Sequence, residues 1–310
     1  MYTEFYNLKE KPFSLTPDPS YLYLSKQHQT ALTMLNYGIE SQAGVTVITG
    51  EVGCGKTTLT RKILHNMEED VTVGLISNAH GSFGDLLQWV MLAFDLKTEN
   101  NDKAARYQLF TEFLIKEYSE NKRTVLIIDE AQNLDIETLE ELRLLTNINA
   151  DKHLVLQLIL IGQPELLEIM QRHELRQLAQ RVSVDYKLKA LGYKETTAYI
   201  RHRLKTAGGE NTIFDKYAAA VVYYHSGGIP RLINTLCDYA LVYGFAEEAP
   251  QIDLALMLNV IKDKQQGGIF PKTTNENREQ AKIRQLIQEQ KGIDVVPDLS
   301  EDEEPTIFQL

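Results

Sequence analysis

The stretch Gly50-Glu51-Val52-Gly53-Cys54-Gly55-Lys56-Thr57 matches the phosphate-binding pattern G-x-x-x-x-G-K-[ST] at every position. Residues 45–49 before it form a β-branched run typical of a buried strand, and residues 58–67 after it place apolar side chains at helical spacing. A glycine loop between a strand and a helix N-terminus presents backbone N–H groups and a partial positive charge to a phosphate. The sequence therefore predicts a nucleotide-binding loop.

The residue types in this loop assign it a ligand and a metal. We expect Lys56 to act in catalysis by reaching the β- and γ-phosphates of ATP, and the Thr57 hydroxyl to ligate Mg²⁺. The predicted nucleotide-binding residues of the loop are Gly50, Glu51, Val52, Gly53, Cys54, Gly55, Lys56, Thr57 and Thr58.

A second motif indicates what happens to the nucleotide. Residues 125–128 are all apolar, as in a strand buried on both faces of a parallel sheet, and they lead into Asp129 and Glu130. Parallel α/β sheets bind ligands at the carboxyl ends of their strands. Asp129 is suited to hold Mg²⁺ and contribute to the nucleotide site, and Glu130 to activate water as a general base. A helix-capping acidic pair is the competing interpretation.

Three further residues are candidates for contact with the γ-phosphate. Gln163 follows the predicted strand 154–161 and either approaches the phosphate or caps the next helix. Arg181 is the first choice, and Arg176 the second, for an arginine that completes the site of a neighbouring subunit, with a surface ion pair as the alternative. Arg231 opens a helix after Gly-Gly-Ile-Pro, where a cation is unfavourable unless it meets an anion.

Strands and helices alternate up to residue 188, after which only helices are predicted, at 193–207, 215–225, 231–245 and 253–264. We therefore expect an α/β nucleotide-binding domain over 1–190, with residues 1–24 wrapping it in extended form, and a small all-α lid over 191–265. Ser25 is expected to cap a helix over 26–39, and 163–180 to form one helix. Residues 266–310 are expected to be a polar, acidic, disordered tail with a single helix over 277–290.

Bulk properties exclude some classes of protein. The chain has 310 residues, a formal net charge of −11 and two cysteines. This charge argues against a whole-surface affinity for DNA or anionic lipid. A cysteine inside the phosphate loop favours a reduced, cytoplasmic compartment, and neither a signal peptide nor a membrane span is expected. Local basic charge is either a DNA contact or a solvated face; its residues are Lys187, Lys189, Arg201, Arg203 and Lys205.

Together these motifs resemble those of AAA+ ATPases: Walker A at 50–57, Walker B at 125–130, sensor 1 near Gln163, an arginine finger near Arg181 and sensor 2 at 228–231. More narrowly, the chain is similar to the family of the general secretion pathway ATPase (ExeA, also GspA) and the pilus protein MshM. The segments that carry this likeness are 12–13 with 16–19, 50–53, 129–132, 162–166 and 227–231. The resemblance covers roughly residues 1–265 and implies a P-loop sheet of order 5-1-4-3-2 flanked by helices. It also implies ATP bound between subunits of a homo-oligomeric ring or filament.

The resemblance implies a function and leaves two alternatives. Secretion-type members carry a transmembrane helix and a peptidoglycan-binding domain, neither of which is expected here, so we expect a member without direct membrane insertion. The expected function is ATP hydrolysis that drives a protein complex of envelope export, secretion, pilus or exopolysaccharide assembly. The alternatives are an ATP-dependent, DNA-binding transposition regulator of the TniB/TnsC kind and a nucleotide-gated scaffold with little turnover.

Overall fold

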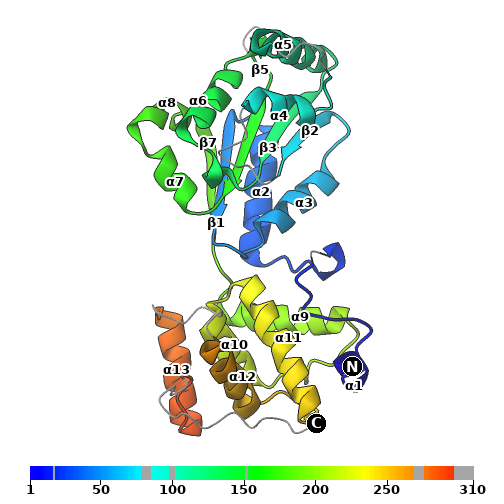
Figure 1. Cartoon of the computed structure of the whole chain (residues 1–310), viewed down its shortest axis with the longest axis vertical. Helices are drawn as coiled ribbons and strands as arrows, with labels where there is room; N and C mark the ends of the chain where they lie inside the picture. The colour runs from blue at the N-terminus through cyan, green and yellow to red at the C-terminus, as the bar shows by residue number, and fades with distance from the viewer. Residues whose placement is uncertain (17, 78–84, 98–101, 151–152, 268–275, 297–310) are drawn as a thin grey trace. The chain divides into compact units, whose positions relative to one another are not determined.

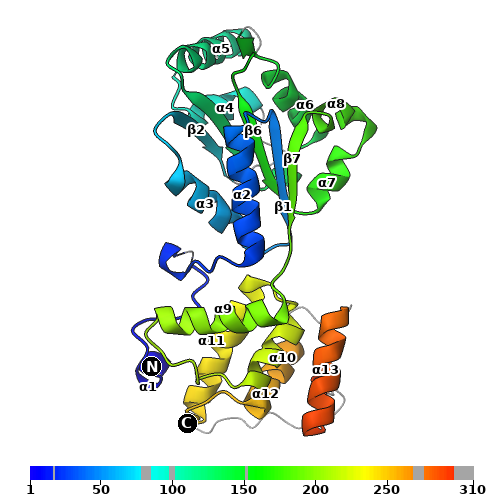
Figure 2. The same ribbon diagram turned by 180° about the vertical axis from the view of Figure 1, so that it is seen from behind.

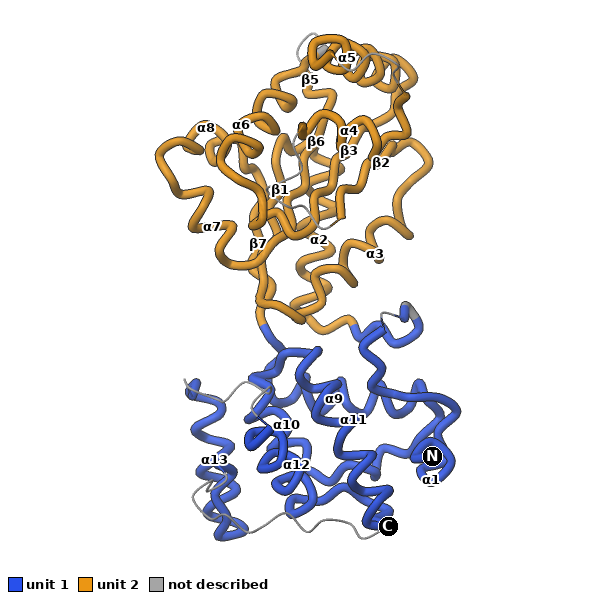
Figure 3. The backbone as a smooth tube through the Cα atoms, viewed as in Figure 1, with its two compact units in different colours: residues 1–23, 190–310 blue, residues 24–189 orange. Residues whose placement is uncertain are grey.

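The computed structural model describes residues 1–16, 18–77, 85–97, 102–150, 153–267 and 276–296. The chain forms two compact units (Figure 3). One unit, Leu24–Lys189, contains the parallel sheet; the other combines Met1–Tyr23 with the chain from Ala190 onward and is helical. We call them the α/β unit and the helical unit.

The α/β unit is built on a five-stranded parallel sheet in the order β2-β3-β6-β1-β7. Counted along the chain, these five strands have the order 5-1-4-3-2, which confirms the prediction. The strands are β1 Val45–Gly50, β2 Val71–Ile76, β3 Arg123–Ile128, β6 Gln157–Gly162 and β7 Val182–Leu188. Strands β1, β3 and β6 lie inside the sheet. Because they are parallel, the loops that follow them come out at the same edge.

Helices cover both faces of this sheet (Figures 1 and 2). Alternate residues of β3 point to opposite faces of the sheet. Val125 and Ile127 pack with α2 and α3, and Leu126 and Ile128 pack with the helices on the other face. This two-sided burial explains why the strand is apolar throughout. The helices on the first face are α2 Lys26–Glu40 and α3 Lys56–Asn66, and those on the second are α4 Leu86–Ala93, α5 Lys103–Ser119, α6 Ile136–Leu145, α7 Glu165–Met170 and α8 Arg176–Ala179.

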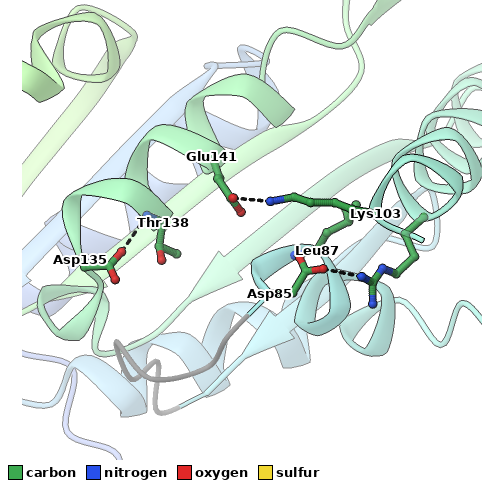
Figure 4. A network of polar contacts seen from close by, with 7 residues as sticks. Asp85, Leu87, Lys103, Asp135, Thr138 and Glu141 are labelled. Carbon is green, nitrogen blue, oxygen red and sulfur yellow. Dashed lines mark hydrogen bonds and ion pairs between the residues drawn. The ribbon is translucent and has the colours of Figure 1, made fainter. Parts of the chain in front are cut away.

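Polar contacts tie together three helices of the second face (Figure 4). Asp85 caps α4 by accepting a 3.0 Å hydrogen bond from the Leu87 N–H and also pairs with Arg106 of α5. Lys103 at the start of α5 pairs with Glu141 of α6. These contacts link α4, α5 and α6 on this face of the sheet.

Most predicted elements of the α/β unit form, including α2 with Ser25 as its N-cap. The predicted continuous helix over 163–180 is wrong, because it breaks at Arg172, whose backbone is extended. The segment consists of α7, the 3₁₀ turn η3 His173–Leu175 and α8. Leu175 and Leu178 are both fully buried after the break, so core packing overrides helix propensity here. Short elements complete the unit: η2 Ala131–Asn133, β4 Asn149–Ala150 and β5 His153–Leu154.

The helical unit is arranged around α10. Every residue from Ala218 to Ser226 in this helix is buried, as expected for a helix surrounded by others. Within the described part of the unit it packs against α9, α11, α12 and α13. The unit's larger helices are α9 Tyr193–Thr206, α10 Lys216–Ser226, α11 Pro230–Ala246, α12 Leu254–Gln266 and α13 Arg278–Lys291.

The N-terminal segment belongs to the helical unit, which corrects the expectation that it extends over an α/β domain spanning 1–190. It is not fully extended, since it contains α1 Tyr2–Phe5 and the 3₁₀ turn η1 Pro19–Tyr21. Arg203 of α9 holds it by donating to the carbonyl oxygens of Pro12 and Ser14. This contact spans 191 residues of sequence, so no local pattern indicates it.

The C-terminal region also differs from the expected disordered tail. Helix α13 forms close to the predicted 277–290 and buries Ile283 and Ile287 in the core of the helical unit. Beyond it, the Val295 carbonyl accepts a 2.8 Å hydrogen bond from Nε2 of His225 on α10. The predicted acidic end, residues 297–310, lies outside the described residues.

Candidate active site

The glycine loop connects β1 to α3 as predicted. Its residue Gly55 has φ +97°, and a Cβ there would lie 2.8 Å from Nε2 of His28, so glycine is required both by conformation and by close approach. Lys56, which begins α3, is only 5% exposed, and its ammonium donates to the carbonyl oxygens of Gly50 (2.8 Å) and Glu51 (3.2 Å). It forms no ion pair with any residue that the structure describes. A buried cation held by carbonyl dipoles alone is suited to receive an anion.

A histidine supports the loop from outside. His28 on α2 donates from Nε2 to the Cys54 carbonyl (3.0 Å), and its Nδ1 contacts the hydroxyl of the cap residue Ser25 (2.8 Å). Both side chains are buried. Because the Cys54 carbonyl is held on the His28 side, this contact contributes to the loop's backbone conformation. Sequence reasoning missed His28, which lies 26 residues before Cys54.

The cysteine of the loop has a packing role in this arrangement. Cys54 is 1% exposed and free, and burial raises the pKa of its thiol to about 11, although the Lys56 charge opposes that shift. The thiol is therefore neutral near pH 7 and unreactive by the usual criterion of thiolate content.

The two predicted magnesium ligands meet at the carboxyl ends of β1 and β3. The Thr57 hydroxyl donates to Oδ2 of Asp129 at 3.3 Å. Asp129 is 7% exposed; burial raises the pKa of its carboxyl group, and a hydrogen bond from the Glu130 N–H opposes this. A hydroxyl beside a buried carboxylate offers the oxygen ligands that Mg²⁺ prefers, and a cation would relieve the cost of burying the charge. The residues therefore fit the metal.

Glu130 sits just beyond β3 in the left-handed region, at φ +56° and ψ 38°. Its Oε2 accepts hydrogen bonds from the side-chain amides of Gln132 (2.7 Å) and Gln163 (3.2 Å). Gln163 thus lies beside Glu130, at the end of the strand next to β3. Gln132, which sequence reasoning did not assign a role, also accepts from the Gln163 N–H at 2.9 Å.

The two candidate trans-acting arginines have different surroundings. Arg181 donates to the backbone carbonyl and hydroxyl of Thr146 (3.0 and 2.9 Å) and to the side chain of Asn147. It thus caps the C-terminal end of α6. Arg176 at the start of α8 is exposed, and its guanidinium forms no hydrogen bond or ion pair with any described residue. Only Arg176 is available to another chain without breaking contacts in its own.

Arg231 belongs to the helical unit, in the first turn of α11. It is exposed, and its guanidinium pairs with nothing in the described part of the chain. The turn before it packs closely on Leu191: Gly228 has φ +77°, its carbonyl accepts from the Leu191 N–H at 2.9 Å, and a Cβ there would lie 1.8 Å from the Leu191 carbonyl oxygen. The turn that carries Arg231 is thus bound to the segment that enters the helical unit from β7.

The predicted basic patch is only partly available. Arg203 is 7% exposed and fully engaged within the helical unit, which corrects its assignment to a DNA-binding surface. Lys187 and Lys189 are exposed, but they belong to the α/β unit, whereas Arg201 and Lys205 belong to the helical unit. The five residues therefore do not form one surface within either unit.

Comparisons with known proteins agree with this geometry. A family model described as an AAA domain matches residues 39–170. General secretion pathway protein A of Aeromonas hydrophila is 42% identical over 253 residues, which are 81% of this chain and 46% of that protein. The chain thus spans about half the length of the curated relative it matches.

Solved structures share the fold. Cdc6p of Pyrobaculum aerophilum aligns with a TM-score of 0.60 at 12% identity, covering 84% of this chain and 72% of that one. The ADP form of the ORC2 protein of Aeropyrum pernix aligns with a TM-score of 0.59 at 16% identity, covering 94% and 87%. At these identities the likeness shows the fold alone. Among the described residues, no helix is both long and apolar enough to cross a membrane.

Proposed function

Because this chain belongs to the AAA-domain P-loop proteins and is a homologue of general secretion pathway protein A, we propose that it binds and hydrolyses Mg-ATP. The observation that carries the proposal is the 3.3 Å contact of Thr57 with Asp129, which joins the phosphate loop to the acidic strand end. The relative's name supports a role in a protein complex of secretion or a related envelope-export system. Changes in assembly state are the proposed output.

The proposed mechanism divides the chemistry among named side chains. The backbone N–H groups of the loop and the Lys56 ammonium bind the phosphates, with Lys56 exchanging its carbonyl partners for phosphate oxygens. Thr57 and Asp129 would hold Mg²⁺, which would neutralise charge on the phosphates. Glu130 accepts a proton from the attacking water, and the Gln163 amide and Arg231 guanidinium respond to the γ-phosphate.

The test of this proposal compares two lysines of α3. Lys56→Ala should abolish ATP binding in calorimetry and phosphate release in a steady-state assay, because it removes the buried cation of the loop. Lys62→Ala, in the same helix, should leave both unchanged. Equal ATP affinity in wild type and Lys56→Ala would contradict the site, and ATP binding without phosphate release in the wild type would favour the nucleotide-gated scaffold.

We further propose that the site is shared between subunits and that Arg176 is the stronger trans-acting candidate. Arg181 would first have to break its hydrogen bonds to Thr146 at the end of α6. Mixing Arg176→Ala with Glu130→Gln protein places the two lesions on opposite sides of some interfaces and leaves others intact. Activity should therefore reappear in the mixture. A mixture in which Arg181→Lys protein replaces the Arg176→Ala protein serves as the comparison. No recovery in mixed assemblies that demonstrably form would contradict a shared site.

A further inference from the structure

We propose that Gln132 is a positioning residue that holds the Glu130 carboxylate for water activation and couples it to Gln163. This inference rests on the proposed ATPase function and assigns a role to a side chain to which the sequence motifs assigned none. It is carried by a closed set of three hydrogen bonds at the ends of β3 and β6.

The chemistry of the neighbours determines how the Gln132 amide is oriented. The Gln163 backbone N–H can only donate, and an ionised Glu130 carboxylate can only accept. Gln132 therefore presents its oxygen to the first (2.9 Å) and its NH₂ group to the second (2.7 Å). A glutamate at position 132 would satisfy Gln163 but repel Glu130, and an apolar residue of equal length would satisfy neither.

The backbone around the amide makes room for it. A Cβ on Gly162, the last residue of β6, would lie 3.0 Å from Oε1 of Gln132 and 2.9 Å from Cδ2 of Leu166. Glycine at the strand end thus allows Gln132 to reach the Gln163 backbone. Glu130 itself adopts a left-handed conformation that costs a residue with a Cβ about 1 kcal/mol or more, so its carboxylate is held by contacts rather than by backbone preference.

The two donors leave the other carboxylate oxygen available. Gln132 and Gln163 both bond to Oε2 of Glu130, and no described residue donates a hydrogen bond to Oε1. Oε1 is therefore the atom that can take a proton from water. Gln132 is bonded to the backbone N–H of Gln163 and not to its side chain. The Gln163 side chain can therefore turn from Glu130 to a γ-phosphate while Gln132 keeps its bonds to the Gln163 N–H and to Glu130. Loss of Gln132 should accordingly affect turnover rather than ATP binding.

The experiment uses two variants of the full chain, with steady-state kinetics, ATP titration and hydrogen exchange at the Gln163 amide. Gln132→Met removes both bonds and should lower kcat roughly tenfold or more, leave the Kd for ATP within about twofold, and speed exchange of the Gln163 amide. Gln132→Glu should lower kcat to a similar extent while the Gln163 amide stays protected, which separates the two halves of the contact. Glu137→Ala, at an exposed position in the first turn of α6, is the control and should retain wild-type kcat.

Failure of this inference can be told apart from failure of the ATPase proposal. Wild-type protein that binds ATP without hydrolysing it overturns the proposed function, and the role of Gln132 in turnover falls with it. Wild-type turnover combined with an unchanged kcat in Gln132→Met overturns the inference alone. A parallel loss of kcat, ATP affinity and thermal stability in both variants would also overturn it, because that result indicates a structural role.

Discussion

The two units hold their candidate functional groups in contrasting ways. In the α/β unit, Lys56, Thr57 and Glu130 are already bonded to other parts of the same site. In the helical unit, Arg231 is exposed and pairs with no described residue, although the turn before it packs closely on Leu191. One unit therefore carries a preorganised centre, and the other carries a cation that pairs with none of the described residues of its own unit.

The units also differ in how they are held together. The α/β site is assembled by loops that directly follow adjacent strands, so short motifs specify it. The helical unit depends on contacts between segments far apart in sequence, such as Arg203 with Pro12 and His225 with Val295. Substitutions at the α/β site should change chemistry, and substitutions of the buried residues that make these long-range contacts in the helical unit should change stability. The predictions below test that division.

The largest stability effect is expected at Arg203. Arg203→Met removes a buried cation bonded to Pro12, Ser14 and Tyr199 and leaves the Pro12 and Ser14 carbonyl oxygens without this donor, so the free energy of unfolding should fall by about 4 kcal/mol in urea titration. Arg201→Met, on the exposed side of the same helix, should change it by about 0.5 kcal/mol or less. Similar values for the two variants would show that the N-terminal segment is not anchored through Arg203.

Helix α13 supplies the next test. Ile287 is fully buried, whereas its neighbour Leu286 is 39% exposed. Ile287→Ala should lower the free energy of unfolding by about 3 kcal/mol, because it leaves a cavity against α10, and Leu286→Ala should cost well under half of that. Both are measured by urea unfolding. Equal, small effects would mean that α13 is not part of the folded core.

A pH effect should come from His225. Burial lowers its pKa from 6.5 to about 4, although the hydrogen bond to the Val295 carbonyl opposes this shift. Between those two pH values the unfolded chain binds more protons than the folded one, so stability is complete above pH 6.5 and is lost as the pH falls toward 4. Between neutral pH and pH 5 the loss should be about 2 kcal/mol.

The matched variant for this pH effect is His225→Gln, which keeps a donor for Val295 and does not titrate. Carboxyl groups elsewhere titrate equally in both proteins, so the difference between the two stability–pH curves isolates His225. Parallel curves between pH 7 and pH 5 would contradict a neutral, buried histidine at this position.

The smallest change in stability is expected at Arg231, and this variant separates an effect on chemistry from an effect on stability most clearly. Arg231→Ala should lower kcat for ATP roughly tenfold, because the cation acts on charge at the γ-phosphate, while the free energy of unfolding changes by about 0.5 kcal/mol or less. Phosphate-release kinetics and urea titration on the same preparation give both quantities. A stability loss comparable to that of Arg203→Met would show that Arg231 is structural.

What could be predicted from the sequence follows the same division. The strands, the loop and the meeting of Thr57 with Asp129 were predictable, because each residue follows a buried strand and parallel strands deliver their ends to one edge. The strand order came from the resemblance. The break at Arg172 and the docking of α13 were not predictable, since they depend on packing against distant elements.

The site contains two residues to which sequence patterns assigned no role. His28 reaches the loop from another helix, and no spacing rule connects it to Cys54. Gln132 is adjacent to the acidic pair, but its role depends on the side-by-side arrangement of β3 and β6. Arg203 was misassigned to a charged surface because its burial arises from the N-terminal segment folding over α9.

The central claim is that the α/β unit holds a hydrolytic centre in which Glu130 activates water. Its most direct test is a single-turnover measurement with radiolabelled ATP on wild type and Glu130→Gln, which keeps the shape of the side chain and removes the base. The account predicts that the variant binds ATP with an affinity within about threefold of wild type but cleaves it roughly 100-fold more slowly. Cleavage of bound ATP at the wild-type rate in Glu130→Gln would contradict the account.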